Sequence, residues 1–233
     1  MSDALAEILR KNYESLLERV EKACLTAGRK PEEVKILGAS KGQNEEKIRV
    51  LYSLGLRLFG ENYVQEAERK IKNLKDLDVD WHFIGRLQTN KAKKSVSLFS
   101  TIHSLDRLAL AEELEKRAKA LNKTLKVLIE INIGHEPTKA GVFEEDLEDF
   151  LEKIKDLSSL KLIGLMCLPP LTEDKSKIRF YFQRMRRIFE RIKPFLGEEF
   201  VELSMGTSSD FEIAIEEGAT IIRIGTLIFG PRV

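Results

Sequence analysis

Cysteine is scarce in this sequence, and long hydrophobic runs are missing from it. The two cysteines, Cys24 and Cys167, stand far apart, which argues against a disulfide framework and against a cysteine metal site. No run reaches the roughly 18 apolar residues of a membrane span. The charged N-terminal segment also lacks the apolar stretch of a signal peptide. We therefore expect a cytoplasmic protein that does not bind membranes.

An excess of charge of one sign is missing as well. Lysine and arginine number 39 against 38 aspartates and glutamates, so the formal net charge is +1 and no global field would gather nucleic acid. The basic clusters at 91–94 and 184–187 lie among acidic residues on predicted helices, as on solvated helix faces. His82, His103 and His135 lack the spacing of metal ligands and are interpreted as packing or surface residues. The sequence thus predicts neither a nucleic-acid partner nor a metal.

Short apolar runs alternate with amphipathic segments along the whole chain. The spacing predicts an N-terminal helix over residues 3–27, then eight strands separated by seven helices. The strands are predicted at 34–40, 57–60, 80–84, 99–104, 125–133, 160–167, 200–204 and 220–225. The helices between them are predicted at 44–54, 62–75, 89–97, 106–121, 144–156, 175–193 and 209–217.

This alternation indicates an α/β fold. Strands that alternate strictly with helices pair in parallel through right-handed crossovers. Runs such as 125–133 and 160–167 are apolar almost throughout, as in strands covered on both faces. Eight such units in 233 residues favour a (β/α)₈ TIM-type barrel with an extra N-terminal helix. An open sheet of six to eight strands is the alternative. No Pro/Gly/Ser-rich linker divides the chain, so residues 1–233 are interpreted as one domain.

Lys41 directly follows the first predicted strand. In a (β/α)₈ barrel the residues after each strand meet at one mouth, where the chemistry gathers. An enclosed lysine there would be a competent nucleophile toward an aldehyde. A surface lysine that closes a strand is the alternative interpretation of this position taken alone.

A glycine- and hydroxyl-rich segment, SMGTSSD at 204–210, follows the seventh predicted strand. It supplies hydroxyl groups around a glycine, and Ser209 with Glu212 fits a capping box that opens a helix. Gly225 and Thr226 follow the eighth strand, and the loops after strands 7 and 8 are the recurrent phosphate site of this barrel. A helix cap without a ligand is the alternative. An amine beside a phosphate cradle is the minimum for holding pyridoxal 5′-phosphate (PLP) as a Schiff base.

Three further residues end strands at the same mouth. Arg223 lies two residues before Gly225, so the two share a face and the arginine could reach the ring of a ligand. A salt bridge inside the barrel is its alternative role. Asn62 follows the second strand and either contacts a ligand or forms an N-cap pair with Gln65. Met166 ends the sixth strand.

The sequence resembles the pyridoxal phosphate homeostasis protein family in seven segments that occur in the family's order. The segments are ASK at 39–41, FGENYVQE at 59–66, WHFIGRLQTNK at 81–91, IHSLD at 102–106, GLM at 164–166, SMGTSSD at 204–210 and RIGTLIFG at 223–230. Two positions depart from the usual pattern. Gly42 replaces the common threonine or tyrosine, and Thr207 replaces a methionine, so the contacts around them are less well defined.

The resemblance implies a barrel like the N-terminal domain of alanine racemase, with PLP on Lys41 as a Schiff base. It implies a phosphate cradle made by the loops after strands 7 and 8. It also implies that Arg223 faces the pyridine nitrogen and keeps it unprotonated, which weakens the ring as an electron sink. Together with the strand ends, this gives nine expected cofactor-binding residues: Lys41, Asn62, Met166, Ser204, Gly206, Ser208, Arg223, Gly225 and Thr226.

The expected role is carriage of the cofactor. Racemisation needs two bases, and in alanine racemase the second is a tyrosine from a C-terminal domain of the partner subunit. Such a domain is not expected here, since Val233 ends the sequence and Tyr63, the one tyrosine near the mouth, is expected to pack in a helix. The leading hypothesis is a monomer that buffers or delivers PLP, maintains vitamin B6 and amino-acid pools, and has apo PLP-dependent enzymes as partners.

Two alternatives use the same residues. A single-domain PLP racemase of weak activity would take water or Tyr63 as its second acid. A PLP-free barrel that acts on sugar phosphates would use the same loops, with Lys41 as an aldolase-type amine.

Overall fold

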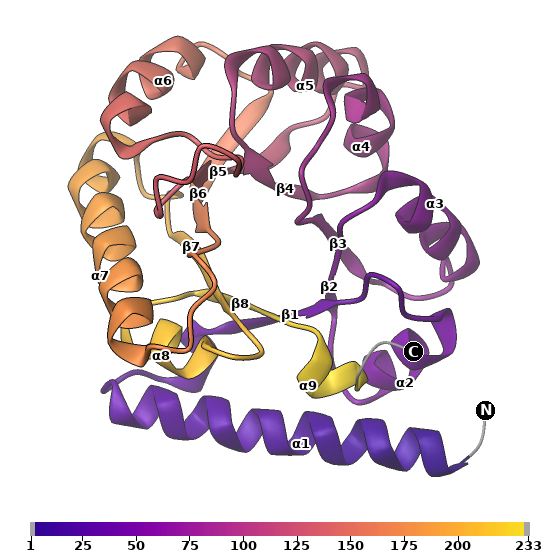
Figure 1. Cartoon of the computed structure of the whole chain (residues 1–233). Coiled ribbons are helices and arrows are strands. Elements are labelled where there is room, and N and C mark those ends of the chain that lie inside the picture. Colours follow the sequence, from indigo (N-terminus) through magenta and orange to yellow (C-terminus); the bar gives the residue numbers. More distant parts are fainter. Residues whose placement is uncertain (1–2, 231–233) are drawn as a thin grey trace.

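A closed barrel of eight parallel strands forms the centre of the protein (Figure 1). The computed structural model describes residues 3–230. Each strand pairs with its neighbours in chain order, and β1 also pairs with β8, which closes the sheet. The strands are β1 (Lys35–Ala39), β2 (Leu58–Glu61), β3 (Asp80–Phe83), β4 (Thr101–Leu105), β5 (Leu125–Ile131), β6 (Leu160–Cys167), β7 (Glu202–Thr207) and β8 (Ile221–Ile224). The predicted (β/α)₈ barrel is confirmed, and the open-sheet alternative is wrong.

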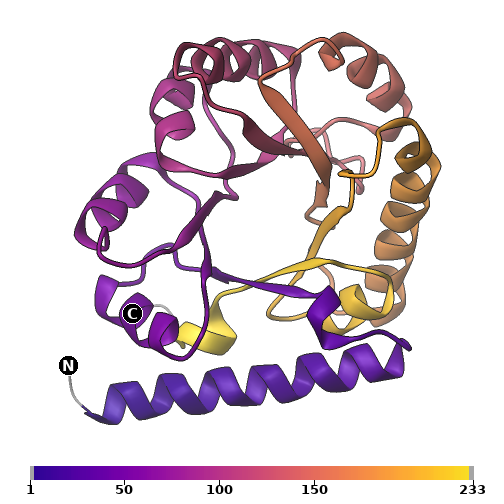
Figure 2. The ribbon, with the colours of Figure 1, turned by 180° about the vertical axis from the view of Figure 1, so that it is seen from behind.

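Helices surround the barrel, as Figures 1 and 2 show from its two ends. The α-helices are α1 (Asp3–Thr26), α2 (Glu45–Ser53), α3 (Val64–Asn73), α4 (Ala92–Leu98), α5 (Leu108–Ala120), α6 (Leu147–Ile154), α7 (Lys175–Ile192), α8 (Phe211–Glu216) and α9 (Thr226–Phe229). Short 3-10 turns are η1 (Pro31–Glu33), η2 (Thr89–Lys91), η3 (Glu144–Asp146) and η4 (Lys193–Phe195). The predicted N-terminal helix is confirmed as α1, whereas the four-residue α9 was not predicted.

Helix α1 lies on the outside of the barrel against α2, α8 and α9. Its buried side chains, such as Leu9, Leu16 and Val20, recur at helical spacing and form the face that packs inward. The helix ends at a left-handed Gly28, whose φ is +65°. Helix α9 follows β8 directly and begins at Thr226. Because α1 packs against α9, it covers the outside of the segment that carries residues 225–226 to the mouth.

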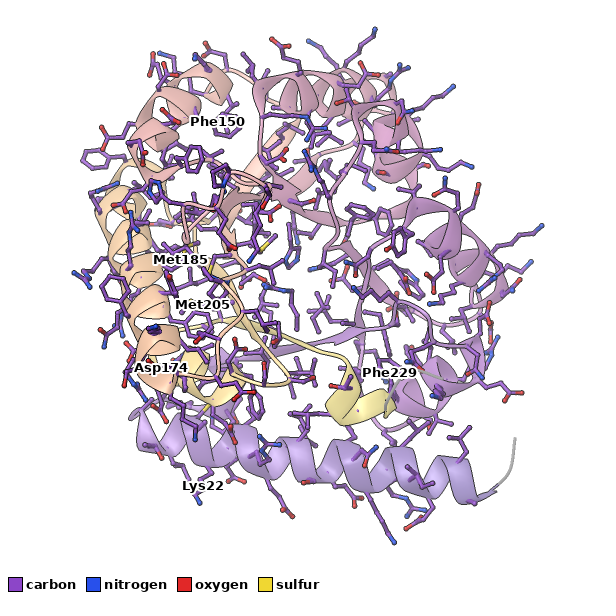
Figure 3. The ribbon with its side chains drawn as sticks, viewed as in Figure 1. Lys22, Phe150, Asp174, Met185, Met205 and Phe229 are labelled. Atoms are coloured by element: carbon purple, nitrogen blue, oxygen red, sulfur yellow. The ribbon has the colours of Figure 1, made fainter. Side chains whose placement is uncertain are left out.

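Two apolar layers hold the fold together. The larger one lies between the strands and the helices, where Met185 of α7 and Met205 of β7 are buried (Figure 3). Smaller apolar clusters fill the barrel interior, one of which contains Met166 with Leu128 and Ile163. Polar groups are buried in the interior as well, including Arg223 of β8. The interior is therefore a packed core with a polar part, as in other barrels of this type.

Strand β7 begins and ends later than the strand predicted at 200–204. It runs from Glu202 through Gly206 to Thr207, so the first residues of the predicted 204–210 loop belong to the strand. Gly206 has a φ of +92°, and a Cβ there would lie 2.5 Å from the Cβ of Ala214 in α8. Gly206 therefore permits close packing of α8 on the strand. In the sequence alone, a glycine among hydroxyl-bearing residues indicates a loop.

Both predicted capping arrangements near the mouth are wrong. Helix α8 begins after Asp210 and has no side-chain cap, because the Asp210 carboxylate accepts the Thr207 N–H at 2.6 Å instead. Helix α3 begins after Tyr63, so Asn62 lies before the cap position. The N-cap role considered for Asn62 is therefore wrong, and its contact with a ligand stays a prediction.

Within residues 3–230, no helix has the length and apolar character needed to cross a membrane.

Candidate functional site at the barrel mouth

A cavity of about 350 Å³ opens where β1, β7 and β8 end. This volume lies within the range of small-molecule sites. Six of the nine expected cofactor-binding residues line it: Lys41, Asn62, Ser208, Arg223, Gly225 and Thr226. The strand-end rule therefore brings together residues that are up to 185 positions apart in the chain.

Lys41 sits in a tight turn directly after β1. The Ser40 carbonyl accepts the Gln43 N–H at 3.0 Å, which makes Lys41 and Gly42 the two central residues of a β-turn. Gly42 has a φ of +72°, a value that side-chain-bearing residues rarely adopt. The departure from the family pattern at Gly42 thus has a local reason, since glycine suits the left-handed position of this turn. Lys41 is half-buried and contributes to the cavity wall.

The turns after β7 and β8 meet at Ser208. Its Oγ accepts the Gly225 N–H at 3.2 Å and lies 3.5 Å from the Leu227 nitrogen. A Cβ on Gly225 would meet nothing closer than the Ala39 carbonyl oxygen at 3.5 Å, so the protein itself leaves room for a side chain there. That room belongs to the cavity. The space and the hydroxyl groups of Ser208 and Thr226 fit a phosphate group, which hydroxyls and backbone N–H groups bind.

Thr207 does not add a free hydroxyl to this cradle. Its Oγ1 lies 3.0 Å from the carboxylate of Asp210, which also accepts its backbone N–H. The second departure from the family pattern therefore stabilises the loop through a local hydrogen bond.

Arg223 forms one wall of the cavity while its guanidinium is anchored inside the barrel. It donates to Ser204 Oγ at 2.7 Å and to the Cys167 carbonyl at 2.8 Å. Burial lowers the pKa of Arg223 from its usual value, although a guanidinium remains charged. Its hydrogen-bond partners among the described residues are this hydroxyl and this carbonyl, so the predicted alternative of a salt bridge is not what holds it. Donors of the five-donor guanidinium remain for a ligand.

Three of the nine expected residues do not line this cavity. Met166 packs inside the barrel, Ser204 supports Arg223 from within the barrel, and Gly206 faces α8. Residues outside the expected nine complete the lining, namely Ala39, Gln43, Ile84, Leu168, Thr207, Ser209 and Gly230. Ala39 and Ile84 could have been found, because each lies at the end of a predicted strand.

A second cavity, of about 490 Å³, adjoins the first and shares Asn62, Leu168 and Ser209 with it. Glu130 of β5 is buried in its wall, and Arg86 lines it as well. Burial raises the pKa of Glu130 to about 7, with a further increase from Asp106. Sequence reasoning missed Glu130 because it lies inside a strand of apolar residues.

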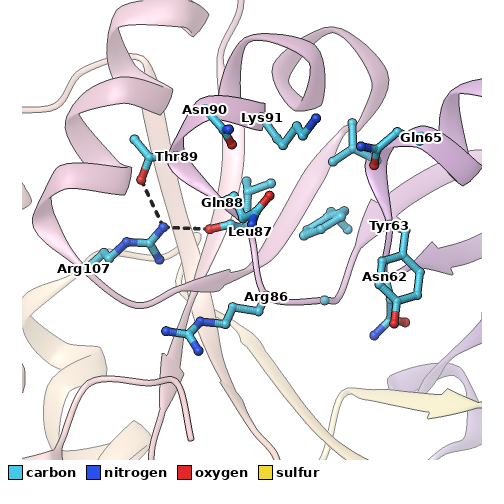
Figure 4. A pocket seen from close by; sticks show the side chains of 13 residues that line it. Asn62, Tyr63, Gln65, Arg86, Leu87, Gln88, Thr89, Asn90, Lys91 and Arg107 are labelled. Carbon is cyan, nitrogen blue, oxygen red and sulfur yellow. Dashed lines mark hydrogen bonds between the residues drawn. The ribbon is translucent and has the colours of Figure 1, made fainter.

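A third cavity, of about 940 Å³, lies beside the second, and Figure 4 shows its side chains. Arg107 holds one side of it by donating to the Leu87 carbonyl at 2.7 Å and to Thr89 Oγ1 at 3.0 Å. Tyr63 lies at its edge with 62% of its surface exposed, so the expectation that this tyrosine packs in a helix is wrong. Tyr63 does not line the cavity that contains Lys41.

The histidines have other partners than metals. His82 and His103 are buried and their ring nitrogens lie 2.8 Å apart, whereas His135 pairs with Glu145 at 3.3 Å near the surface. No group of three or more His, Cys, Asp or Glu side chains within residues 3–230 is arranged to hold a metal ion.

A parallel barrel with a lysine after β1 and a hydroxyl- and glycine-bearing cradle after β7 and β8 defines the class of alanine racemase-like barrels. The family described as "Alanine racemase, N-terminal domain" matches residues 9–233. The chain belongs to this family, and within it to the pyridoxal phosphate homeostasis proteins. The resemblance noted from the sequence is thereby confirmed.

The similarity to individual relatives extends over most of each chain. A pyridoxal phosphate homeostasis protein of Aquifex aeolicus is 50% identical over 93% of this chain and 95% of its own length. One from Pseudomonas aeruginosa is 39% identical over 96% of both chains. Among solved structures, PipY of Synechococcus elongatus with PLP bound has a TM-score of 0.81 and 37% identity, covering 91% of this chain and all of its own.

Proposed function

We propose that this chain binds PLP and buffers or delivers it, and that it thereby maintains vitamin B6 and amino-acid pools. The observation that carries the proposal is the cavity that unites Lys41 with Ser208, Gly225 and Thr226 beside Arg223. A primary amine can bond to the cofactor aldehyde, while hydroxyl and N–H groups bind its phosphate. The names of the relatives and the PLP-bound structure of PipY support the same ligand.

Each expected residue has a role in this proposal. Lys41 supplies the amine that bonds to the cofactor, and Asn62 contacts it from the cavity wall. Ser208, Gly225 and Thr226 hold the phosphate, and Ser204 with Gly206 shapes the strand from which that loop departs. Arg223 faces the pyridine nitrogen, and Met166 supports the site from the barrel interior. Residues 1–233 act as one PLP-binding domain, which the family match over residues 9–233 supports.

A carrier is favoured over an enzyme. When bound, PLP supplies an electron sink for an attached amino acid. A racemase would also need a second acid–base group beside Lys41. Among the described residues that line the Lys41 cavity, none is Tyr, His, Cys, Asp or Glu. We take apo PLP-dependent enzymes as recipients of the cofactor, and the chain as a cytoplasmic monomer.

A weak PLP-dependent racemase is the second candidate function. It is favoured by Glu130, whose pKa is raised to about 7 and which lines the adjoining cavity. A carboxyl group with such a pKa can accept or donate a proton near neutral pH. The third possibility, a barrel for sugar phosphates, has less support, because relatives that match nearly the whole chain are named for PLP.

Borohydride reduction followed by peptide mass spectrometry tests the proposal. The protein is incubated with PLP, reduced and digested, and a pyridoxyl adduct is expected on Lys41. Lys41→Ala should lose that adduct, whereas Lys22→Ala, which changes an exposed lysine of α1, should keep it. An adduct on Lys91 or Lys139 would overturn the site assignment. A protein that remains colourless with PLP and forms no adduct would favour the sugar-phosphate barrel.

A further inference from the structure

Lys70 of α3 is completely buried, although lysine seldom is. Its Nζ donates to the Ser40 carbonyl at 2.6 Å and to the carboxylates of Glu61 and Glu66 at 2.7 Å each. An ammonium group has three N–H donors, so these three acceptors use all of them. The cluster joins α3, the end of β2 and the turn that carries Lys41.

The two carboxylates also hold that turn directly. Ser40 Oγ donates to Glu61 Oε1 at 2.6 Å, and the Gly42 N–H donates to Glu66 Oε1 at 2.7 Å. The peptide group before Lys41 is therefore bound through its carbonyl to Lys70, and the peptide group after Lys41 through its N–H to Glu66. One cluster, centred on the buried Lys70, thus restrains both peptide groups that flank Lys41.

Stability alone is a poor reason for such a cluster. Burying charges costs several kcal/mol per ion, and well-packed apolar residues often stabilise a protein as well or better. Glu61 Oε2 is buried and lacks a hydrogen-bond partner within the described residues, which adds to that cost. Burial raises the pKa of Glu61, while Lys70 opposes the increase. What the cluster provides is orientation, because it fixes a two-residue turn from both sides.

We propose that Lys70 is a positioning residue which, through Glu61 and Glu66, sets the turn so that the Lys41 amine meets the aldehyde of a phosphorylated B6 vitamer. The inference rests on the proposed function. In the step concerned, the Lys41 nitrogen bonds to the aldehyde carbon, and the aldehyde oxygen leaves as water with two protons from the amine. A misplacement of about 1 Å can reduce the efficiency of such a step about 100-fold.

Two ligands separate positioning from general damage to the pocket. PLP can bond to Lys41, whereas pyridoxine 5′-phosphate carries an alcohol in place of the aldehyde and can only dock. We expect Lys70→Met to weaken PLP retention at least about tenfold and to reduce the visible absorbance of the bonded cofactor. Its affinity for pyridoxine 5′-phosphate should change less than about twofold, because the phosphate cradle after β7 and β8 is untouched.

Lys123→Met is the matched control. Lys123 also donates to two backbone carbonyls, those of Val96 and Phe99 at 2.6 and 2.7 Å, but it does so at the end of α4, away from Lys41. Lys123→Met should lower the free energy of unfolding without changing the ratio of the affinities for PLP and pyridoxine 5′-phosphate. An equal loss of affinity for both ligands in Lys70→Met would overturn the inference. A change of the affinity ratio in Lys123→Met as large as that in Lys70→Met would overturn it as well.

Glu66 gives a test that does not depend on the folding of Lys70→Met. Its side chain is partly exposed at 19%, so substitutions are tolerated better. Glu66→Gln keeps an oxygen for the Gly42 N–H and should retain PLP, whereas Glu66→Ala removes that acceptor and should lose the bonded cofactor selectively. Identical PLP retention in both variants would refute positioning. An unmodified Lys41 in the wild-type protein would refute the proposed function itself.

Discussion

The Arg223 guanidinium donates to Ser204 Oγ at 2.7 Å, and both side chains are buried inside the barrel. The same hydroxyl lies 3.0 Å from Nδ1 of His103. The protons along this row are all used when the hydroxyl donates to His103 Nδ1 and the Nε2–H of His103 donates to Nδ1 of His82, 2.8 Å away. Burial lowers the pKa of His103 well below its usual value, so the ring stays neutral as this order requires. Arg223 is thus fixed from below by a directed row of hydrogen bonds.

Removal of the Ser204 hydroxyl tests this support. Ser204→Ala leaves a buried guanidinium donor and a His103 nitrogen without a partner, and an unsatisfied buried polar group costs about 1–3 kcal/mol. We expect that loss in urea unfolding, together with several-fold weaker binding of PLP in a fluorescence titration. Ser97→Ala, at an exposed serine of α4, is the control and should change neither. A Ser204→Ala protein as stable as this control would show that Arg223 does not depend on the hydroxyl.

The left-handed turn at Gly42 gives a second prediction. A side chain at a φ of +72° costs about 1–2 kcal/mol in the left-handed region. Nothing lies within 4 Å of a Cβ built there, so the cost is one of backbone conformation and not of collision. Gly42→Ala should therefore lower the free energy of unfolding by about 1 kcal/mol, whereas Gly42→Asn should lose less, because asparagine tolerates this region. Equal stability of the alanine variant and the wild type would contradict the turn geometry.

Much of the fold followed from the sequence because the period of the apolar residues changes at each element. Eight β-branched runs with helical segments between them allow few arrangements, and the strand-end rule then placed Lys41, Ser208, Gly225 and Thr226 around one cavity. The end of β7 was misjudged, since Gly206 and its hydroxyl-bearing neighbours have the composition of a loop.

The charged interior could not be predicted in the same way. Lys70 belongs to the segment ERKIKN, where so many charged residues indicate a solvated helix face. Only the approach of α3 to the β1 turn, a contact between residues 30 positions apart, makes it a buried centre of hydrogen bonds. The role of Glu130 could not be predicted either. A single acidic residue within an apolar strand does not reveal that its side chain lines a cavity.

The raised pKa of Glu130 predicts a dependence of stability on pH. In the unfolded chain this carboxyl group titrates near its ordinary pKa of 4.5, and in the folded protein near 7. Between these values the folded state binds more protons, so the contribution of Glu130 to stability falls as the pH rises through this window. Glu130→Gln should remove the decline and should be more stable than the wild type by about 1–3 kcal/mol at pH 8.

Urea unfolding of both proteins at pH 5 and pH 8 measures this difference. At pH 5 the carboxyl group is largely protonated in the folded state, and the two proteins should be closer in stability. Glu32→Gln, at an exposed position, serves as the control for loss of one negative charge and should show no such pH dependence. A constant difference between wild type and Glu130→Gln across the window would mean that Glu130 titrates normally.

Hydrogen exchange at the α-carbon of amino acids in D₂O decides between carrier and weak racemase. The proposed carrier should exchange this hydrogen no faster than free PLP does at the same concentration, because the Lys41 cavity offers no second acid–base side chain among its described lining residues. If Glu130 serves as that group, exchange by the wild type should exceed this background. It should then fall to the background in both Lys41→Ala and Glu130→Gln, and remain in Glu32→Gln. Loss in Lys41→Ala alone would indicate that water supplies the proton.

Since Glu130 is half protonated near pH 7, exchange that depends on it should change across the same pH window as its stability effect. Agreement of the two pH profiles would assign the chemistry to this carboxyl group, and a flat background rate in every variant would leave PLP as cargo.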